Sequence, residues 1–354
     1  MKMSPNPIKS KTHQSRINFW LPQQVLVTPA AYDEPWGQQI IKRLEKYHLR
    51  ITKLSQNRIT GLRGKNERET YAIAKNTLAI VNAPPSQLKL TPIPPSADWQ
   101  FHLAQGCPAH CQYCYLAGSL SGVPVVKVYA NLPQIIANLK NYEQQNKNTT
   151  YEVSCYTDPL GIEHLTGSLA ECIRYFGTRD KAYLRWVSKF DRVDELLDLP
   201  HNGHTRCRVS LNADPISHSM EGGTATVNQR LQALRKLALH GYPIGIVIAP
   251  IMAIANWQAH YTKLFHQIEQ TLDLECDLTF ELITHRFTPK SKEVLQTWYP
   301  NSKLNLDERD RSEKRNKFGG VKYVYHRDTM SELKEFIQDK INTRFPEAKI
   351  LYWT

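Results

Sequence analysis

The chain has no long uninterrupted hydrophobic run among its 354 residues. Its longest apolar stretch, 244–255, contains Gly245 and Pro250 and is shorter than the roughly 20 residues that span a bilayer. The basic N-terminus is not followed by a continuous apolar segment, so we expect no secretory signal. These absences predict a cytoplasmic protein with no membrane partner.

Acidic residues are scarce relative to basic ones. The chain has 33 Asp and Glu against 45 Lys and Arg, which gives a formal net charge of +12. A positive field of this kind attracts polyanions, of which nucleic acid is the commonest. A basic enzyme without a nucleic-acid partner could carry the same charge, so the charge alone does not decide the partner.

Cysteines are few, and they show no paired framework. Their number, seven, is odd, which agrees with a reducing compartment. Three of them, Cys107, Cys111 and Cys114, form a C-x3-C-x2-C motif. Three thiolates suit a [4Fe–4S] cluster and leave one iron free to bind a small molecule.

Two other interpretations of the motif stay open. A zinc ion would need a fourth ligand, for which His102 and His110 are the nearby candidates. Zinc sites usually also have a second C-x2-C pair, and the sequence has none. The thiols could also be inert. We favour the iron–sulfur cluster over both alternatives.

The chain divides into three predicted regions. Residues 1–20 are polar and basic and are expected to form a disordered arm. Residues 21–98 are expected to form a small α/β region that ends in a proline-rich linker over 82–95. Residues 99–354 form the third region, in which strand-like and helical patterns alternate.

This alternation predicts an α/β fold, because repeated strand–helix–strand units build a parallel sheet with helices outside it. Six such units predict a partial (β/α)6 barrel, similar to a TIM barrel, with its chemistry at the carboxyl ends of the strands. The predicted helices cover 132–145, 165–176, 226–240 and 257–272. The predicted strands cover 99–103, 151–155, 183–189, 206–211, 243–249 and 278–282.

Four residues with chemical potential fall at these strand ends. Cys107 follows the first predicted strand, and Cys155 ends the second. Lys189 ends the third, and Asn212 follows the fourth. We therefore expect all four on one rim of the barrel.

Several separate stretches match one known family. They cover 107–116, 128–132, 154–159, 161–166, 184–189, 210–214, 248–250 and 279–288. In these stretches the chain resembles the spore photoproduct lyase family of radical S-adenosylmethionine (SAM) enzymes, and the resemblance extends from about residue 24 to the C-terminus. It implies a radical SAM partial barrel with a C-terminal β-hairpin.

The resemblance also implies an activity. The family reverses spore photoproduct, the thymine dimer 5-thyminyl-5,6-dihydrothymine, to two thymines in DNA. Its cofactors are a [4Fe–4S] cluster, here on Cys107, Cys111 and Cys114, and SAM, whose cleavage yields a 5′-deoxyadenosyl radical. The implied partners are DNA that contains a thymine photolesion and an external one-electron reductant such as flavodoxin or ferredoxin.

Three catalytic residues follow from the resemblance. Cys155 would donate hydrogen to the thymine radical, and Tyr113 and Tyr115 would help return the radical to deoxyadenosine. The chemistry agrees, because a thiol S–H bond is weak and a phenol O–H bond is the next most suitable. Without the motif, a strand cysteine would more often be a small core side chain. We expect that for the remaining cysteines, Cys172, Cys207 and Cys276.

SAM-binding residues are also implied by the motif match. They are Thr157, Lys189, Ser210, Asn212 and Ala249. Arg208, Ser210 and Asn212 alternate on one face of a predicted strand, and such a polar interior face needs a ligand or a network of partners. A buried structural network is the alternative for this face.

A basic segment near the C-terminus is the candidate DNA contact. Residues 309–322 combine six Lys and Arg residues with a Gly–Gly pair, and the family has a hairpin there that prises the lesion outward. A lesion must leave the base stack to reach an enclosed site. The family's Arg–Tyr pair is Lys–Phe here, which keeps charge and ring but loses the guanidinium fork and the hydroxyl. The implied contact residues are Arg315, Lys317, Phe318 and Lys322.

Two further functions stay open at this point. The chain could be a diverged radical SAM enzyme that acts on another nucleic-acid substrate. It could also be a non-catalytic, metal-stabilised DNA-binding protein, which would be colourless with zinc rather than brown with iron and sulfide.

Overall fold

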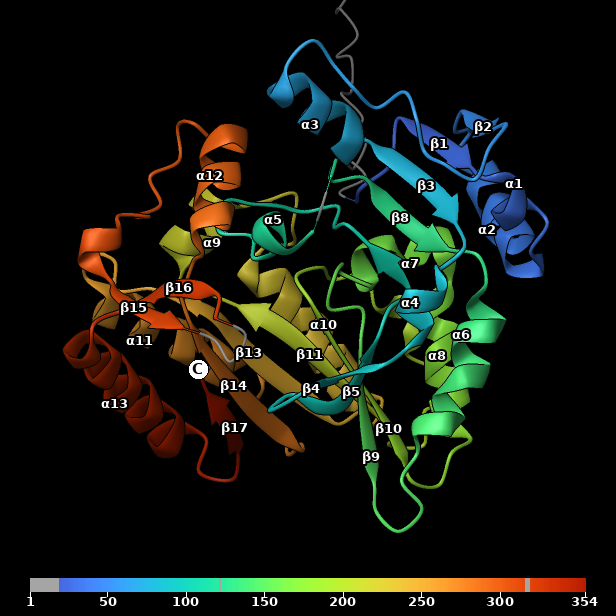
Figure 1. The fold of residues 1–354 in the computed structure, drawn as a ribbon. Coiled ribbons are helices and arrows are strands. Elements are labelled where there is room, and N and C mark those ends of the chain that lie inside the picture. The colour runs from blue at the N-terminus through green and yellow to red at the C-terminus, as the bar shows by residue number, and fades with distance from the viewer. Residues whose placement is uncertain (1–18, 121, 316–318) are drawn as a thin grey trace, which may run out of the picture.

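The computed structural model describes residues 19–120, 122–315 and 319–354. Most of the predicted N-terminal arm, up to residue 18, lies outside these residues, and so do Lys317 and Phe318. In the described ranges no helix is long and apolar enough to cross a bilayer. Two larger β-sheets and the helices around them make up the fold (Figure 1).

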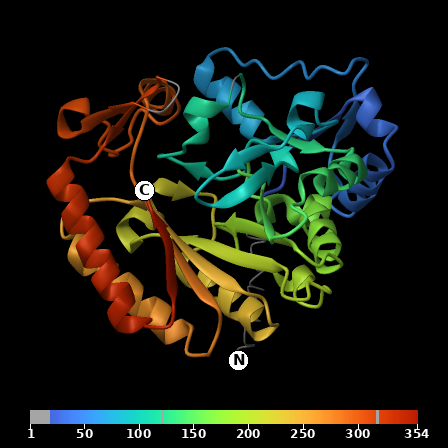
Figure 2. The ribbon, with the colours of Figure 1, turned by 60° about the horizontal axis from the view of Figure 1, so that its bottom comes forward.

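The larger sheet curls into an open half-barrel (Figure 2). All neighbouring strands in it are parallel except β4 and β5. The six predicted strands lie next to one another in the order of the sequence, so the partial (β/α)6 barrel is confirmed. In spatial order the strands are β17 (Lys349–Trp353), β14 (Leu278–Thr284), β13 (Ile244–Ile251), β11 (Thr205–Leu211), β10 (Ala182–Ser188), β9 (Thr149–Val153), β5 (Ala97–Phe101) and β4 (Thr91–Ile93).

Helices surround the outer face of the half-barrel (Figure 2). Helix α10 (Val227–Leu239) shows how the sequence determines where these helices begin and end. It begins at a capping box in which Thr226 and Gln229 each accept a hydrogen bond from the other's backbone N–H. The chain leaves it through Gly241 at φ 79°. The helices are α6 (Leu132–Leu139), α7 (Leu160–Thr166), α8 (Ser168–Gly177), α10 (Val227–Leu239), α11 (Trp257–Thr271) and α13 (Arg327–Arg344).

The single helix predicted over 165–176 is wrong, because the structure has two helices that meet at Gly167. Gly167 has φ 67°, and its N–H donates to the Glu163 carbonyl at 2.8 Å, which ends α7. The Glu163 carboxylate then accepts the N–H groups of Leu169 and Ala170 at the start of α8. Burial raises the pKa of Glu163 to about 7. The apolar spacing continues across the break, so the sequence period does not reveal it.

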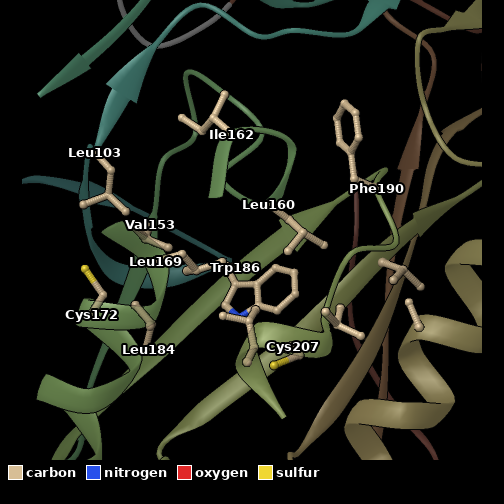
Figure 3. Close-up of a cluster of buried hydrophobic side chains, with 14 of the residues drawn as sticks. Leu103, Val153, Leu160, Ile162, Leu169, Cys172, Leu184, Trp186, Phe190 and Cys207 are labelled. Atoms are coloured by element: carbon tan, nitrogen blue, oxygen red, sulfur yellow. The ribbon is translucent and has the colours of Figure 1, made fainter. Parts of the chain in front are cut away.

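Apolar side chains from the sheet and its helices form the main core (Figure 3). Trp186 of β10 and Cys207 of β11 lie side by side in it, and Cys172 of α8 is also fully buried. The prediction that Cys172 and Cys207 are core residues is confirmed. Cys276 is only partly buried at the edge of this core, just before β14, so it was wrongly placed inside it.

The smaller sheet joins the N-terminal region to the barrel region. Its first strands come from residues before 98, but β8 and β6 come from beyond that position. Val25, Leu78, Val128 and Leu103 belong to one continuous core cluster. The boundary at residue 98 stays a prediction, and it crosses this shared sheet. In spatial order the strands are β2 (Ile51–Lys53), β1 (Gln24–Val27), β3 (Thr77–Val81), β8 (Val126–Tyr129) and β6 (Ala104–Gln105).

Several elements were not predicted from the sequence. The stretch 82–95 is not a simple linker, because it contains α4 (Pro85–Leu88) and the edge strand β4. Its prolines suit an edge position, where a missing N–H costs little. The other helices without a sequence prediction are α1 (Pro29–Tyr32), α3 (Glu67–Lys75), α5 (Leu116–Ser119), α9 (Asp214–Met220) and α12 (Pro289–Trp298). Helix α2 (Pro35–Glu45), in contrast, agrees with the helical spacing of apolar residues over 36–47 in the sequence.

A buried ion network fills the concave side of the half-barrel. Arg208 is 2% exposed and donates hydrogen bonds to both Glu281 oxygens, at 2.8 and 2.7 Å, and to Glu152. Glu281 also accepts a hydrogen bond from Arg185, and another of 2.6 Å from the Tyr352 hydroxyl. For Arg208, therefore, the alternative of a buried structural network is the right one.

We expect Arg208→Met to lower the free energy of unfolding by about 3–5 kcal/mol, because it leaves two buried carboxylates with too few partners. Urea denaturation followed by circular dichroism measures the loss. The matched control is Arg174→Met, whose ion pair with Glu171 is 47% and 43% exposed and should cost less than about 1 kcal/mol. Equal losses in the two variants would contradict this account of the network.

Candidate active site

A pocket of about 410 Å³ opens at the carboxyl ends of the half-barrel strands. The three-cysteine loop forms one wall, and residues at the ends of β10, β11, β13 and β14 form the other. This is the rim that the sequence predicts as the site of chemistry. The predicted site residues that line it are Cys107, Cys111, Tyr113, Cys114, Tyr115, Thr157, Lys189, Ser210 and Ala249.

The cysteine loop is held from the N-terminal region. Lys75, the last residue of α3, is buried, and its ammonium donates hydrogen bonds to the carbonyls of Cys107 and Ala109. Tyr71 of the same helix shares a hydrogen bond of 3.0 Å with the Nδ1 atom of His110. Neither contact could be predicted from the sequence, because both come from helix α3, which was not predicted either.

A short strand pair holds the loop from the barrel side. β7 (His110–Cys111) pairs antiparallel with β12 (Glu221–Gly222), so that Cys111 lies opposite Glu221. The backbone N–H of Gln112 also donates to the Met220 carbonyl at 2.9 Å. The loop is thus fixed on two sides before any metal binds.

The chemistry of the three thiols suits a [4Fe–4S] cluster, because iron–sulfur clusters are held by cysteine thiolates. In the described ranges, no group of three or more His, Cys, Asp or Glu side chains is placed to hold a metal ion. Cysteines of a cluster each bind a different iron and can stand farther apart. Burial raises the pKa of the Cys107 thiol to about 11 and also raises that of Cys111, so cluster binding must release protons.

One pocket residue has an unused polar atom that fits a polar cofactor. The Thr157 Oγ1 atom is buried and has no hydrogen-bond partner in the structure. Buried hydroxyls are rarely left without a partner, because desolvation then costs free energy. Ser210 and Ala249 line the same pocket. The polar groups of SAM would supply the missing partner.

Glu221 is the most connected acidic residue of the pocket surroundings. Its carboxylate accepts the Tyr113 hydroxyl and contacts the fully buried Arg230 at 2.6 Å, and Lys189 lies 4.0 Å away. Burial raises the pKa of Glu221, but Lys189, Arg230 and the Tyr113 hydroxyl together lower it below its usual value. Glu221 therefore stays ionised and fixes the Tyr113 ring.

Lys189 and Asn212 differ in how they meet the pocket. Lys189 lines it and donates a hydrogen bond of 2.6 Å to the Ser210 hydroxyl. Asn212 lies behind the wall, where its amide donates to the Pro250 carbonyl at 2.7 Å and its oxygen accepts the Tyr261 hydroxyl at 3.0 Å. Asn212 thus supports the pocket wall in this structure, and its role in SAM binding stays a prediction.

Cys155 lies in the turn that leaves β9, beside the pocket but not in its wall. Ser154 before it adopts φ 61°, a strained conformation that clusters at functional sites. The carbonyl of Tyr156 after it accepts the Gly106 N–H at 2.9 Å, which ties this turn to the cysteine loop. Burial first, and then the Glu152 carboxylate, raise the pKa of Cys155 well above its usual value. The thiol therefore keeps its hydrogen at neutral pH.

The predicted C-terminal hairpin is present beside the pocket mouth. It consists of β15 (Ser312–Arg315) and β16 (Val321–Val324) in antiparallel pairing. The backbones of Tyr323 and Phe287 exchange two hydrogen bonds, of 3.2 and 2.8 Å, which attach the hairpin to the end of β14. Burial first, and then the cations of Arg286 and Lys314, lower the pKa of Lys322. Arg286 itself lines the pocket, so this cationic group reaches its edge.

Comparisons with known proteins agree with this geometry. The family described as spore photoproduct lyase matches residues 20–354. The spore photoproduct lyase of Bacillus subtilis (strain 168) is 39% identical over 342 residues, which cover 95% of this chain and 99% of that protein. That of Clostridium acetobutylicum is 33% identical over 332 residues, or 93% and 98%.

Solved structures show the same relationship. A spore photoproduct lyase mutant with bound AdoMet and dinucleoside spore photoproduct has a TM-score of 0.90 and 37% identity, and covers 95% of this chain and 99% of its own. A spore photoproduct lyase complexed with dinucleoside spore photoproduct has the same TM-score and identity, and covers 94% and 99%. The motifs, the pocket and these matches together show that the chain belongs to the spore photoproduct lyase family.

Proposed function

We propose that this protein is a radical SAM lyase that reverses spore photoproduct in DNA to two thymines. One observation carries the proposal: a single pocket joins the three-cysteine loop to Thr157, Lys189, Ser210 and Ala249 at the barrel rim. Family membership supports it, and the structure of a relative with bound AdoMet and lesion indicates the ligands that such a pocket accepts.

Different pocket residues would bind the two cofactors. Cys107, Cys111 and Cys114 would hold a [4Fe–4S] cluster, and Thr157, Ser210, Ala249 and Lys189 would hold SAM, with Asn212 behind them. Bound in this way, the two cofactors would supply a 5′-deoxyadenosyl radical. We also propose an external one-electron carrier, such as flavodoxin or ferredoxin, as the electron source, and a cytoplasmic location.

The three radical-handling side chains stand in different environments. Cys155 is a partly buried thiol whose raised pKa keeps it in the S–H form that a hydrogen-atom donor needs. Tyr113 is fixed by Glu221, whereas Tyr115 is 64% exposed at the pocket edge. We infer that Cys155 gives its S–H hydrogen atom to the thymine radical, which leaves a radical on the sulfur. The two tyrosines would then supply a hydrogen atom from their O–H groups, so that the radical moves toward the cofactor side of the pocket.

The decisive experiment is an anaerobic reaction of reconstituted protein with SAM, dithionite and a dinucleoside spore photoproduct. Chromatography should show release of thymidine. SAM cleavage without loss of the lesion would instead favour another nucleic-acid substrate. A colourless protein that holds one zinc ion and releases nothing would favour a DNA-binding protein.

We expect Lys322→Gln to weaken binding of single-stranded oligonucleotides and to make the salt dependence shallower by about one unit, as for one lost phosphate contact. The reason is that Lys322 and Lys314 lie close to Arg286, which lines the pocket. Fluorescence anisotropy at several salt concentrations measures both quantities. The control is Lys140→Gln, which removes the same charge at an exposed position directly after helix α6. An unchanged slope would remove Lys322 from the DNA contact.

A further inference from the structure

A second, smaller pocket of about 200 Å³ lies beside the large one. Lys127 of β8, Gln105 of β6 and Gln87 of α4 contribute to its wall, together with Tyr156 from the turn after β9. None of the radical chemistry above uses this pocket. Its wall contains no Asp or Glu among the described residues.

The two pockets lie next to each other, because the turn after β9 and helix α5 contribute residues to both walls. Thr157 lines the large pocket and Tyr156, the residue before it, lines the small one. The short helix α5 separates them, with Leu116 in the wall of the large pocket and Ser119 in that of the small one. Figure 1 shows α5 between α12 on one side and β8 of the N-terminal sheet on the other.

Lys127 and Gln105 bring two polar side chains to the wall of the small pocket. Lys127 and Gln105 are register partners on the antiparallel strands β8 and β6, so their side chains leave the same face of the sheet. Among the described residues, the Lys127 ammonium has no hydrogen bond or ion pair. Burial lowers the pKa of Lys127, which shows that the charge is partly desolvated. A desolvated cation without a counter-charge is costly, and a bound anion would remove that cost.

The size of the small pocket selects the kind of anion. One water occupies about 30 Å³ in the liquid, so about 200 Å³ holds a tetrahedral phosphate group and a few waters. A lysine ammonium with amide and phenol donors suits phosphate oxygens. A stacked base with its sugar would need more room.

The position of the small pocket points to DNA as the source of the phosphate. Thr157 follows β9, near one end of the curled sheet, and Arg286 follows β14, near the other end. Lys127 therefore supplies a cation at the β9 end of the large pocket, and Arg286 and Lys322 supply cations at the β14 end. A strand whose lesion enters the large pocket would meet positive charge on both sides.

We propose that the Lys127 pocket binds a backbone phosphodiester of the DNA strand, one that flanks the lesion held in the large pocket. The proposal rests on the proposed repair function and adds a second DNA contact, separate from the C-terminal hairpin. It predicts that Lys127 contributes to binding of a lesion in a strand but not of the isolated lesion.

The test compares Lys127→Gln with the unchanged protein on two substrates. On a single-stranded oligonucleotide that contains one spore photoproduct, the variant should bind about tenfold more weakly, with a salt dependence shallower by about one unit. On the dinucleoside lesion, which has no phosphate, its rate of thymidine release should equal that of the unchanged protein.

Two further variants complete the design. Lys127→Arg keeps the charge and should restore most of the oligonucleotide affinity, and Lys140→Gln controls for net charge. Equal losses of Lys127→Gln on both substrates, or no loss on either, would overturn the proposal. If no variant and no unchanged protein releases thymidine from the dinucleoside, the repair function fails, while the oligonucleotide binding data still decide the phosphate contact.

Discussion

Cys111→Ala is expected to abolish thymine release. Cys111 is one of three loop thiols in the pocket wall, and without it only two protein ligands remain for the cluster. Loss of an outer partner of a metal ligand typically costs about 10–100-fold, so loss of a direct ligand should cost more than about 100-fold. Without the cluster, SAM has no electron source, and its cleavage should stop as well.

The measurement is the iron and sulfide content of protein purified without oxygen, together with visible absorption and SAM cleavage. Cys276→Ala is the matched control, because Cys276 is also a free thiol but is remote from the pocket wall. A Cys111→Ala protein with full iron content and normal turnover would show that the loop does not bind the cluster. The fold should survive the change, because β7 pairs with β12 through backbone groups that alanine retains.

Cys155→Ala is expected to uncouple lesion consumption from thymine formation. The first hydrogen abstraction does not use Cys155, so the lesion should still be consumed. The thymine radical then lacks its thiol donor, and the yield of thymine per lesion should fall by about tenfold or more, which corresponds to at least about 1.4 kcal/mol. Chromatography should show side products in its place. A normal thymine yield would show that another group donates the hydrogen.

The partial burial of Cys155 also determines the pH dependence of that yield. Because burial raises its pKa well above the usual value, the thiol stays protonated from neutral pH through pH 9. Thymine yield per lesion should therefore stay constant between pH 7 and pH 9. An exposed thiol of ordinary pKa would lose its hydrogen over that range, so a yield that falls toward pH 9 would contradict the burial of Cys155.

The barrel could be predicted because its strands are short apolar runs that alternate with amphipathic helices. Trp186 and Cys207 show why, since the same alternation that marks β10 and β11 in the sequence places them in the core. The cysteines of the site could be found because they lie within eight residues of one another. Cys155, Lys189 and Ser210 were assigned through family motifs, and only the fold brings their strand ends together.

The remaining parts of the site have no local signal. Lys75 reaches the carbonyl of Cys107 across 32 residues of chain, and Glu221 reaches Tyr113 across 108. A single lysine or glutamate in a polar stretch is compatible with any exposed helix or loop, so only tertiary packing reveals its role. The split at Gly167 and the strand β4 were missed for a related reason, because their determinants are a single backbone conformation and an edge position.

The route of the chain between its two sheets has a consequence for how the protein can be divided. The polypeptide enters the larger sheet at β4 and β5, crosses back to give β6 and β8 to the N-terminal sheet, and re-enters the larger sheet at β9. A fragment that began at residue 99 would contain β8 without its neighbour β3. It would also contain the cysteine loop without Lys75, whose ammonium donates a hydrogen bond to the Cys107 carbonyl. The chain thus alternates between the two sheets and does not complete one before it begins the other. Neither half on its own would therefore contain both the complete N-terminal sheet and the lysine contact that holds the cysteine loop.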